Sequence, residues 1–169
     1  MREENTVSLG ELDPSKVIPP LEEYVSKIVA ARKAGRICNG HAIGLGWQEL
    51  NSYAAAGLSD DHETVETDEL LNKLRLGLRI LIREGSTERN VEELVKGILE
   101  HRLPTDSMMF CTDDKHVNEI KEEGHISFNI QKAIDLGLPA FDALRMATCN
   151  AARHFRIEHL VGSLTPGKY

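Results

Sequence analysis

Short apolar runs alternate with segments of helical period along this 169-residue chain. In the helical segments, apolar side chains recur every three or four residues, which predicts one buried face for each helix. These segments cover residues 21–34, 47–56, 67–76, 91–99, 117–136 with a break at Gly124, and 141–155. Short apolar runs that end in polar side chains predict strands. The runs cover residues 6–11, 36–40, 58–60, 80–82 and 108–112.

The alternation of strands and helices predicts the fold class. A strand followed by a helix, repeated five times, indicates an α/β protein with a parallel sheet and helical crossovers. Two architectures fit this order, part of a (β/α)8 TIM-type barrel and a small open doubly wound sheet. Polar residues recur at successive strand ends rather than at one switch point, which favours the barrel. In the last helix, one face is shared by Phe141, Leu144, Ala147, Ala151 and Phe155.

Four of the five predicted strands end in side chains that are common metal ligands: Glu11, His41, His62 and Asp113. Imidazole and carboxylate groups suit Zn, Mn or Fe, without deciding among them. A carboxylate at a strand end can also move a proton. A single histidine at a strand end is more often a hydrogen-bonded structural residue than a metal ligand. Asp113 can instead cap the next helix. The recurrence at four strand ends favours a metal site.

Composition narrows the function classes. The net charge of −7 argues against a broad nucleic-acid-binding surface. No apolar run approaches the length of a membrane span, and residues 1–5 lack the pattern of a signal peptide. Cys38, Cys111 and Cys149 are far apart and form no C-x-x-C pair. We therefore expect reduced thiols in a cytoplasmic protein and no cysteine metal site.

Three familiar motifs are incomplete or absent. Residues 41–46 are rich in glycine but lack the spacing of a dinucleotide-binding loop. Residues 162–168 match the start of a phosphate-binding loop, but Tyr169 replaces the required Ser or Thr and Pro166 lies inside the loop. No G-x-S-x-G sequence occurs, so a nucleophile-elbow hydrolase has no support.

Five short motifs resemble the adenine deaminase family of the amidohydrolase superfamily. They are Leu9-Gly10-Glu11, Gly40-His41-Ala42, Asp61-His62-Glu63, Phe110-Cys111-Thr112-Asp113-Asp114 and Glu122-Glu123-Gly124-His125-Ile126. The last two are the most specific. Residues 146–152 resemble the superfamily's helix after the last barrel strand, and residues 162–167 resemble the turn into its β-sandwich. The resemblance runs from about residue 7 to residue 168, which is nearly the whole chain.

The resemblance implies hydrolysis of adenine to hypoxanthine and ammonia. The reaction would take place at a binuclear divalent metal centre, of Mn, Fe or Zn, in a (β/α)8 barrel. Glu11 is implied as the metal-bridging carboxylate of the fourth barrel strand, and His41 and His62 as the ligands of the fifth and sixth strands. Asp113 is implied as the eighth-strand ligand that takes the proton from the attacking hydroxide and delivers it to the substrate.

Three further residues are expected near the substrate. The resemblance implies that Glu63 and Asp114 contact the purine, and these two are the next candidates for proton transfer after Asp113. His116 is close enough to Asp113 in the chain to contact a substrate, and a solvated loop residue is the alternative.

The chain departs from the family at Ile43, Asp60 and Ala151, where Pro, Ser and Pro are usual, and none of these changes removes a ligand. The family's His-x-His pair of the first strand has no counterpart, because no two of the seven histidines are two positions apart. A full barrel needs about 250 residues. We therefore expect residues 1–169 to form one partial barrel domain, covering about strands four to eight. The N-terminal strands, the β-sandwich and the C-terminal region would lie outside it.

The expected partners follow from this interpretation. Adenine is the expected small-molecule substrate, with neither nucleic acid nor a membrane as partner. A partial barrel has unpaired edges, which favours self-association or dependence on the missing barrel half, so the isolated chain should be a poor deaminase. Two alternatives remain. One is an amidohydrolase that acts on another cyclic amidine or amide, and the other is a non-catalytic remnant or assembly module of this fold.

Overall fold

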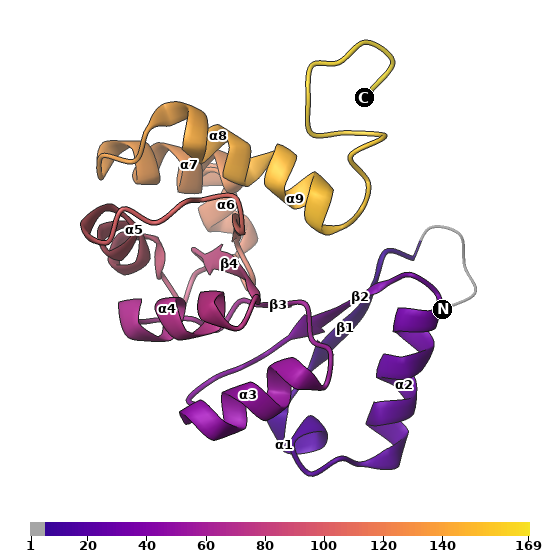
Figure 1. Ribbon diagram of the computed structural model, residues 1–169. Helices are drawn as coiled ribbons and strands as arrows, with labels where there is room; N and C mark the ends of the chain where they lie inside the picture. Colours follow the sequence, from indigo (N-terminus) through magenta and orange to yellow (C-terminus); the bar gives the residue numbers. More distant parts are fainter. Residues whose placement is uncertain (1–5) are drawn as a thin grey trace.

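A computed structural model describes residues 6–169 (Figure 1). Residues 1–5, for which we expected no signal peptide, lie outside the described residues. The strands are β1 (Ser8–Leu12), β2 (Ile37–Gly40), β3 (Asp60–Asp61), β4 (Arg79–Arg83) and β5 (Met108–Cys111). The helices are α1 (Pro14–Val17), α2 (Glu22–Lys33), α3 (Trp47–Ala55), α4 (Thr67–Arg75), α5 (Val91–Glu100), α6 (Val117–Glu123), α7 (Ile126–Asp135), α8 (Ala140–Ala147) and α9 (Cys149–His154). Within this part of the chain, no helix combines the length and apolar character needed to cross a membrane.

The strands are parallel and lie side by side in chain order. β1 pairs with β2, and β4 pairs with β3 on one side and β5 on the other. The two sheets meet between β2 and β3, where the Ser59 amide donates to the Cys38 carbonyl at 2.7 Å. The predicted parallel α/β arrangement is therefore confirmed. The strand order of the described residues shows no reversal of the kind that marks the switch point of a doubly wound sheet.

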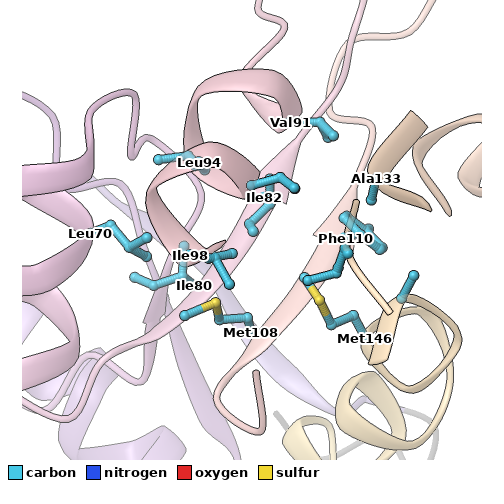
Figure 2. Close-up of a cluster of buried hydrophobic side chains, with 13 residues drawn as sticks. Leu70, Ile80, Ile82, Val91, Leu94, Ile98, Met108, Phe110, Ala133 and Met146 are labelled. Atoms are coloured by element: carbon cyan, nitrogen blue, oxygen red, sulfur yellow. The ribbon is translucent and has the colours of Figure 1, made fainter. Parts of the chain in front are cut away.

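The main apolar core lies between β4, β5 and the helices that cover them (Figure 2). Alternate residues of both strands point into it, as the two-residue period of a strand requires. The buried side chains that Figure 2 labels are Leu70, Ile80, Ile82, Val91, Leu94, Ile98, Met108, Phe110, Ala133 and Met146. A second core packs α2 and α3 against β1 and β2 and includes Leu12, Ile28, Cys38 and Tyr53. Both cores hold the strands in place, so the strand ends have defined positions.

The region predicted as one helix over residues 141–155 is two helices, α8 and α9. They meet at Thr148, whose φ of −128° and ψ of −86° lie outside the helical region. The Thr148 hydroxyl donates to the Leu144 carbonyl at 2.6 Å, a local bond of the kind that competes with helix continuation. The face that holds Phe141 and Leu144 is exposed, and Ala143 and Met146 are buried instead.

β3 comprises Asp60 and Asp61. It therefore begins at the last residue of the predicted strand, residues 58–60, and ends one residue after it. Asp60 is fully buried although it is acidic, and its Oδ2 lies 2.5 Å from Nε2 of the buried His154 in α9. Its Oδ1 accepts a hydrogen bond from the Gly40 amide at 3.0 Å. This pairing explains how an aspartate can replace the serine that the family resemblance led us to expect.

Gly40 allows β2 and β3 to approach closely, because a Cβ atom there would lie 2.1 Å from the Asp60 carbonyl oxygen. We expect Gly40→Ala to lower the free energy of unfolding by about 1–3 kcal/mol, since the strands would have to separate. Urea denaturation measures the change. Gly10→Ala in β1 is the matched control, because a Cβ there meets nothing within 4 Å. Equal stability of the two variants would contradict the close approach.

Candidate metal centre and active site

The carboxyl ends of three neighbouring strands bring three of the predicted ligands together. Glu11 lies in β1, His41 follows β2, and His62 follows β3. One ligand atom from each of the three lies within 4.8 Å of the other two. The strands are parallel, so their carboxyl ends share one edge of the sheet, which is where α/β proteins place their chemistry.

Asp113 belongs to a second group that shares His62. Ligand atoms of His62, Glu63 and Asp113 also lie within 4.8 Å of one another. His62 Nε2 is 3.3 Å from a carboxylate oxygen of Glu11 and 3.4 Å from one of Glu63. His41 Nδ1 is 3.8 Å from Glu11 and 3.7 Å from Glu63. The four predicted ligands thus lie in two overlapping groups, with Glu63 beside both histidines.

These separations fit a divalent metal ion better than a hydrogen-bonded cluster. They exceed the usual length of a good N–H···O hydrogen bond. Two ligands that each lie about 2.1 Å from one ion, in tetrahedral arrangement, are about 3.4 Å apart. Nδ1 of His41 is buried and has no hydrogen-bond partner among the described residues, a condition that proteins rarely tolerate. Imidazole and carboxylate donors complete a set that suits Zn, Mn or Fe.

Arg83 is a residue of this site that the sequence analysis missed. It is buried at the end of β4, and its Nη1 donates to Glu63 and, at 3.0 Å, to Oδ2 of Asp113. Burial acts to lower the pKa of Arg83, but the hydrogen bonds to the two carboxylates outweigh it and raise the pKa. The guanidinium is therefore a fixed cation between two carboxylates. A signal was available in the sequence, because a charged residue follows the predicted strand at residues 80–82, but arginine is not a common metal ligand.

The carboxylate of Asp61 fixes the backbone immediately after each of the two histidines. Its Oδ1 accepts from the Ala42 amide at 2.6 Å, next to His41. Its Oδ2 accepts from the Glu63 amide at 3.0 Å, next to His62, and from the Lys73 ammonium at 2.8 Å. Because Asp61 and Lys73 are both buried, this ion pair is a rigid support for the loops that carry the candidate ligands.

Tyr53 of α3 links the ends of β1 and β2. Its hydroxyl accepts a hydrogen bond from the His41 amide at 2.8 Å and donates to the Leu12 carbonyl, next to Glu11. Burial is the main cause that raises the pKa of Tyr53, so the hydroxyl keeps the proton that it donates. A helix residue therefore sets the spacing of two candidate ligands on neighbouring strands.

The structure does not bring Asp114 and His116 into contact with this cluster. Both are exposed on the loop between β5 and α6. Asp114 accepts from the Thr87 hydroxyl at 2.8 Å, and the His116 amide donates to the Ser86 hydroxyl at 2.8 Å. His125, which the sequence analysis left without a role, places Nε2 at 3.0 Å from the Thr112 hydroxyl at the end of β5.

Substitution of His62 tests the metal site, because this residue belongs to both groups. We expect His62→Ala to weaken Zn²⁺ or Mn²⁺ binding at least about tenfold, since even residues that only support a ligand change metal affinity by 10–100-fold. Titration calorimetry on the metal-free protein measures the change. His101→Ala, in an exposed residue at the end of α5, is the matched control. Unchanged affinity in the His62 variant would argue against a metal at this position.

A family model described as the amidohydrolase family matches residues 2–169. The chain belongs to the amidohydrolase family. Its fold is shared with a solved β-aspartyl dipeptidase from Fervidobacterium islandicum, with a TM-score of 0.71 at 18% sequence identity. That alignment covers 98% of this chain and 52% of the dipeptidase chain. The parallel α/β architecture is thus that of amidohydrolases.

Curated relatives support the more specific resemblance found in the sequence. The adenine deaminase of Desulforamulus reducens is 63% identical over 163 residues, which cover 96% of this chain and 28% of that protein. The adenine deaminase of Desulfitobacterium hafniense is 46% identical over 162 residues, which cover 95% of this chain and 28% of that protein. The resemblance to adenine deaminases is confirmed, and the chain spans about 28% of the length of these relatives.

Proposed function

We propose that this chain is a segment of a metal-dependent adenine deaminase, which hydrolyses adenine to hypoxanthine and ammonia. The supporting observation is the group formed by Glu11, His41 and His62 at the carboxyl ends of adjacent parallel strands. It occurs in a chain that is 63% identical to a curated adenine deaminase. In this proposal residues 1–169 form one domain that covers about strands four to eight of a (β/α)8 barrel, from β1 as the fourth to β5 as the eighth.

The candidate ligands suit a binuclear centre of Mn, Fe or Zn. Glu11 would be shared by the two ions, His41 and His62 would hold one of them, and Asp113 would contribute to the other; the supporting observation is that these residues lie in two overlapping groups. Such a metal, when bound, makes water a nucleophile at neutral pH and polarises the bond under attack. The donor set does not decide which of the three metals is used.

Asp113 is the proposed proton carrier. Arg83 holds Oδ2 of Asp113, whereas Oδ1 accepts no hydrogen bond within the described residues. Oδ1 is therefore the atom that can take a proton from the attacking water and pass it to the purine. The same Arg83 nitrogen holds Glu63, so the two carboxylates keep a fixed spacing while the proton moves.

Three further residues are proposed to contact the substrate. Glu63 lies beside both histidines, where it can contact the purine and handle a second proton. Asp114 and His116 occupy the exposed loop before α6, and we propose that they contact the purine at the mouth of the site.

The proposal also covers partners and location. Within residues 6–169, β1 and β5 each pair with a strand on one side only. We propose that these edges pair with further barrel strands or with a second copy of the chain, as exposed edges tend to do. Cys38, Cys111 and Cys149 are free thiols, which supports a reducing, cytoplasmic location.

A chimera tests the proposed activity directly. The segment would replace its counterpart in the Desulforamulus reducens adenine deaminase, and adenine loss and hypoxanthine formation would be followed by chromatography after loading with Mn, Fe or Zn. We expect turnover by the chimera, because the candidate ligands would meet the rest of the active site. Metal binding without adenine turnover would instead favour another cyclic amidine or amide as substrate. Loss of both would favour a non-catalytic remnant.

The isolated chain provides the complementary test. We expect the 169 residues alone to self-associate and to turn over adenine slowly or not at all, because they contain no His-x-His pair and leave two strand edges unpaired. Size-exclusion chromatography with light scattering would accompany the adenine assay. A monodisperse monomer with robust turnover would contradict the partial-barrel interpretation.

A further inference from the structure

Three arginines surround one cavity at the amino ends of β2 and β3, the opposite ends of these strands from the candidate metal centre. The cavity has a volume of about 400 Å³ and is lined by Arg32, Arg36, Arg156 and the connection at residues 57–59. Arg32 comes from α2, Arg36 precedes β2, and Arg156 follows α9. Figure 1 shows the end of α9 approaching the connection between α2 and β2. Segments that are far apart in the sequence thus contribute three positive charges to one place.

None of these arginines has an anionic partner in residues 6–169. Within these residues no carboxylate oxygen lies within 4 Å of their guanidinium nitrogens. Arg36 is half-buried, and Arg32 and Arg156 are exposed, so an anion from solvent can reach the three side chains. Nε of Arg36 is buried and has no hydrogen-bond partner. The dipole of α2 favours cations in its last turn, which holds Arg32 and Lys33, but Arg36 and Arg156 lie outside that helix. Mutual repulsion and an unsatisfied donor are costs that a bound anion would remove.

The surrounding backbone contacts two of the arginines, Arg32 and Arg156. Gly57 has a φ of +104°, a conformation that favours glycine, and the guanidinium of Arg32 lies against it, 2.4 Å from where a Cβ atom would stand. Nη1 of Arg156 donates to the Gly35 carbonyl at 2.6 Å. Arg156 itself has a φ of +59°, a left-handed conformation that long side chains rarely adopt. Such strain is often found at ligand clamps.

We propose that Arg32, Arg36 and Arg156 form a binding site for a phosphate-type oxyanion, either inorganic phosphate or the phosphate group of a nucleotide. Guanidinium groups present several N–H donors in a planar fork that matches the oxygens of a phosphate. Converging arginines without carboxylate partners are the arrangement that such an anion requires. The proposed phosphate site is independent of the proposed deaminase activity, because none of its three arginines is assigned to that reaction.

Titration calorimetry on metal-free protein tests the site, with EDTA present so that phosphate cannot bind through a metal. Sodium phosphate would be titrated in a buffer held at constant ionic strength with chloride. We expect saturable binding with a stoichiometry of one, weakened at least tenfold in Arg36→Gln and in Arg32→Gln. Parallel titrations with adenosine monophosphate and adenosine distinguish the two sources of the anion. Tighter binding of the nucleotide than of phosphate would identify a nucleotide site, and equal binding would identify the phosphate alone.

Two further variants keep the result interpretable. Arg75→Gln removes an equal charge from an exposed residue of α4 and should bind phosphate like the parent protein. Arg156→Gly removes the third guanidinium while relieving the left-handed backbone, so it should remain folded and bind phosphate more weakly. The absence of saturable phosphate binding by the parent would overturn the proposal. Equal binding by the parent, the Arg36 and the Arg32 variants would also overturn it.

Discussion

Asp113→Asn is expected to reduce adenine turnover by about 10²–10⁴-fold, the usual contribution of a positioned proton-transfer group. The amide has nearly the same shape as the carboxylate but cannot accept the proton. The fold should be spared, because Asp113 has a φ of +52° and asparagine tolerates this left-handed conformation as readily as aspartate. The amide oxygen can also still accept the hydrogen bond from Arg83. The measurement is kcat for adenine in the chimera described above.

The control for this variant is Asp68→Asn, the same chemical change at an exposed position in the first turn of α4. It should leave kcat unchanged. Circular dichroism and thermal melting of both variants separate lost chemistry from lost structure. Near-normal turnover by the Asp113 variant would move the proton-transfer role to Glu63 or Asp114.

The fold was largely predictable because its main signals are periodic. Alternation of apolar runs and amphipathic segments identified the five strand regions and the parallel order of the sheet. Gly124 correctly marked the break between α6 and α7, where its φ of +101° suits glycine. The break at Thr148 was not predictable in this way, because a threonine inside an apolar periodic segment ends a helix only when its local bonds and neighbours favour it.

The candidate site was partly predictable for a similar reason. Residues that follow strand ends can be read from the sequence, and Glu11, His41 and His62 do lie together. The residues that support them cannot be found this way. Arg83, Tyr53 and Lys73 act through contacts between elements far apart in the chain, and such pairings have no period along a sequence. Only the folded arrangement reveals which buried charges are partners.

The ion pair between Lys73 and Asp61 is the support with the largest expected effect on stability. The two side chains are 2% and 0% exposed. We expect Lys73→Met to lower the free energy of unfolding by about 3–5 kcal/mol, because it leaves the Asp61 carboxylate buried without its counter-charge. Metal affinity should fall as well, since Asp61 also binds the amides of Ala42 and Glu63 beside the candidate ligands. Urea denaturation and metal titration measure the two effects.

Lys96→Met is the matched control for this prediction. Lys96 lies 2.6 Å from Glu92, but both side chains are more than half exposed, so the pair should contribute at most about 1 kcal/mol. Adding Asp61→Asn to Lys73→Met should recover part of the lost stability, because the neutral amide removes the uncompensated charge. If Lys73→Met and Lys96→Met lowered the free energy of unfolding equally, the buried pair would contribute no more to stability than an exposed one. If the double variant were no more stable than Lys73→Met alone, the loss would come from packing of the lysine side chain rather than from its charge.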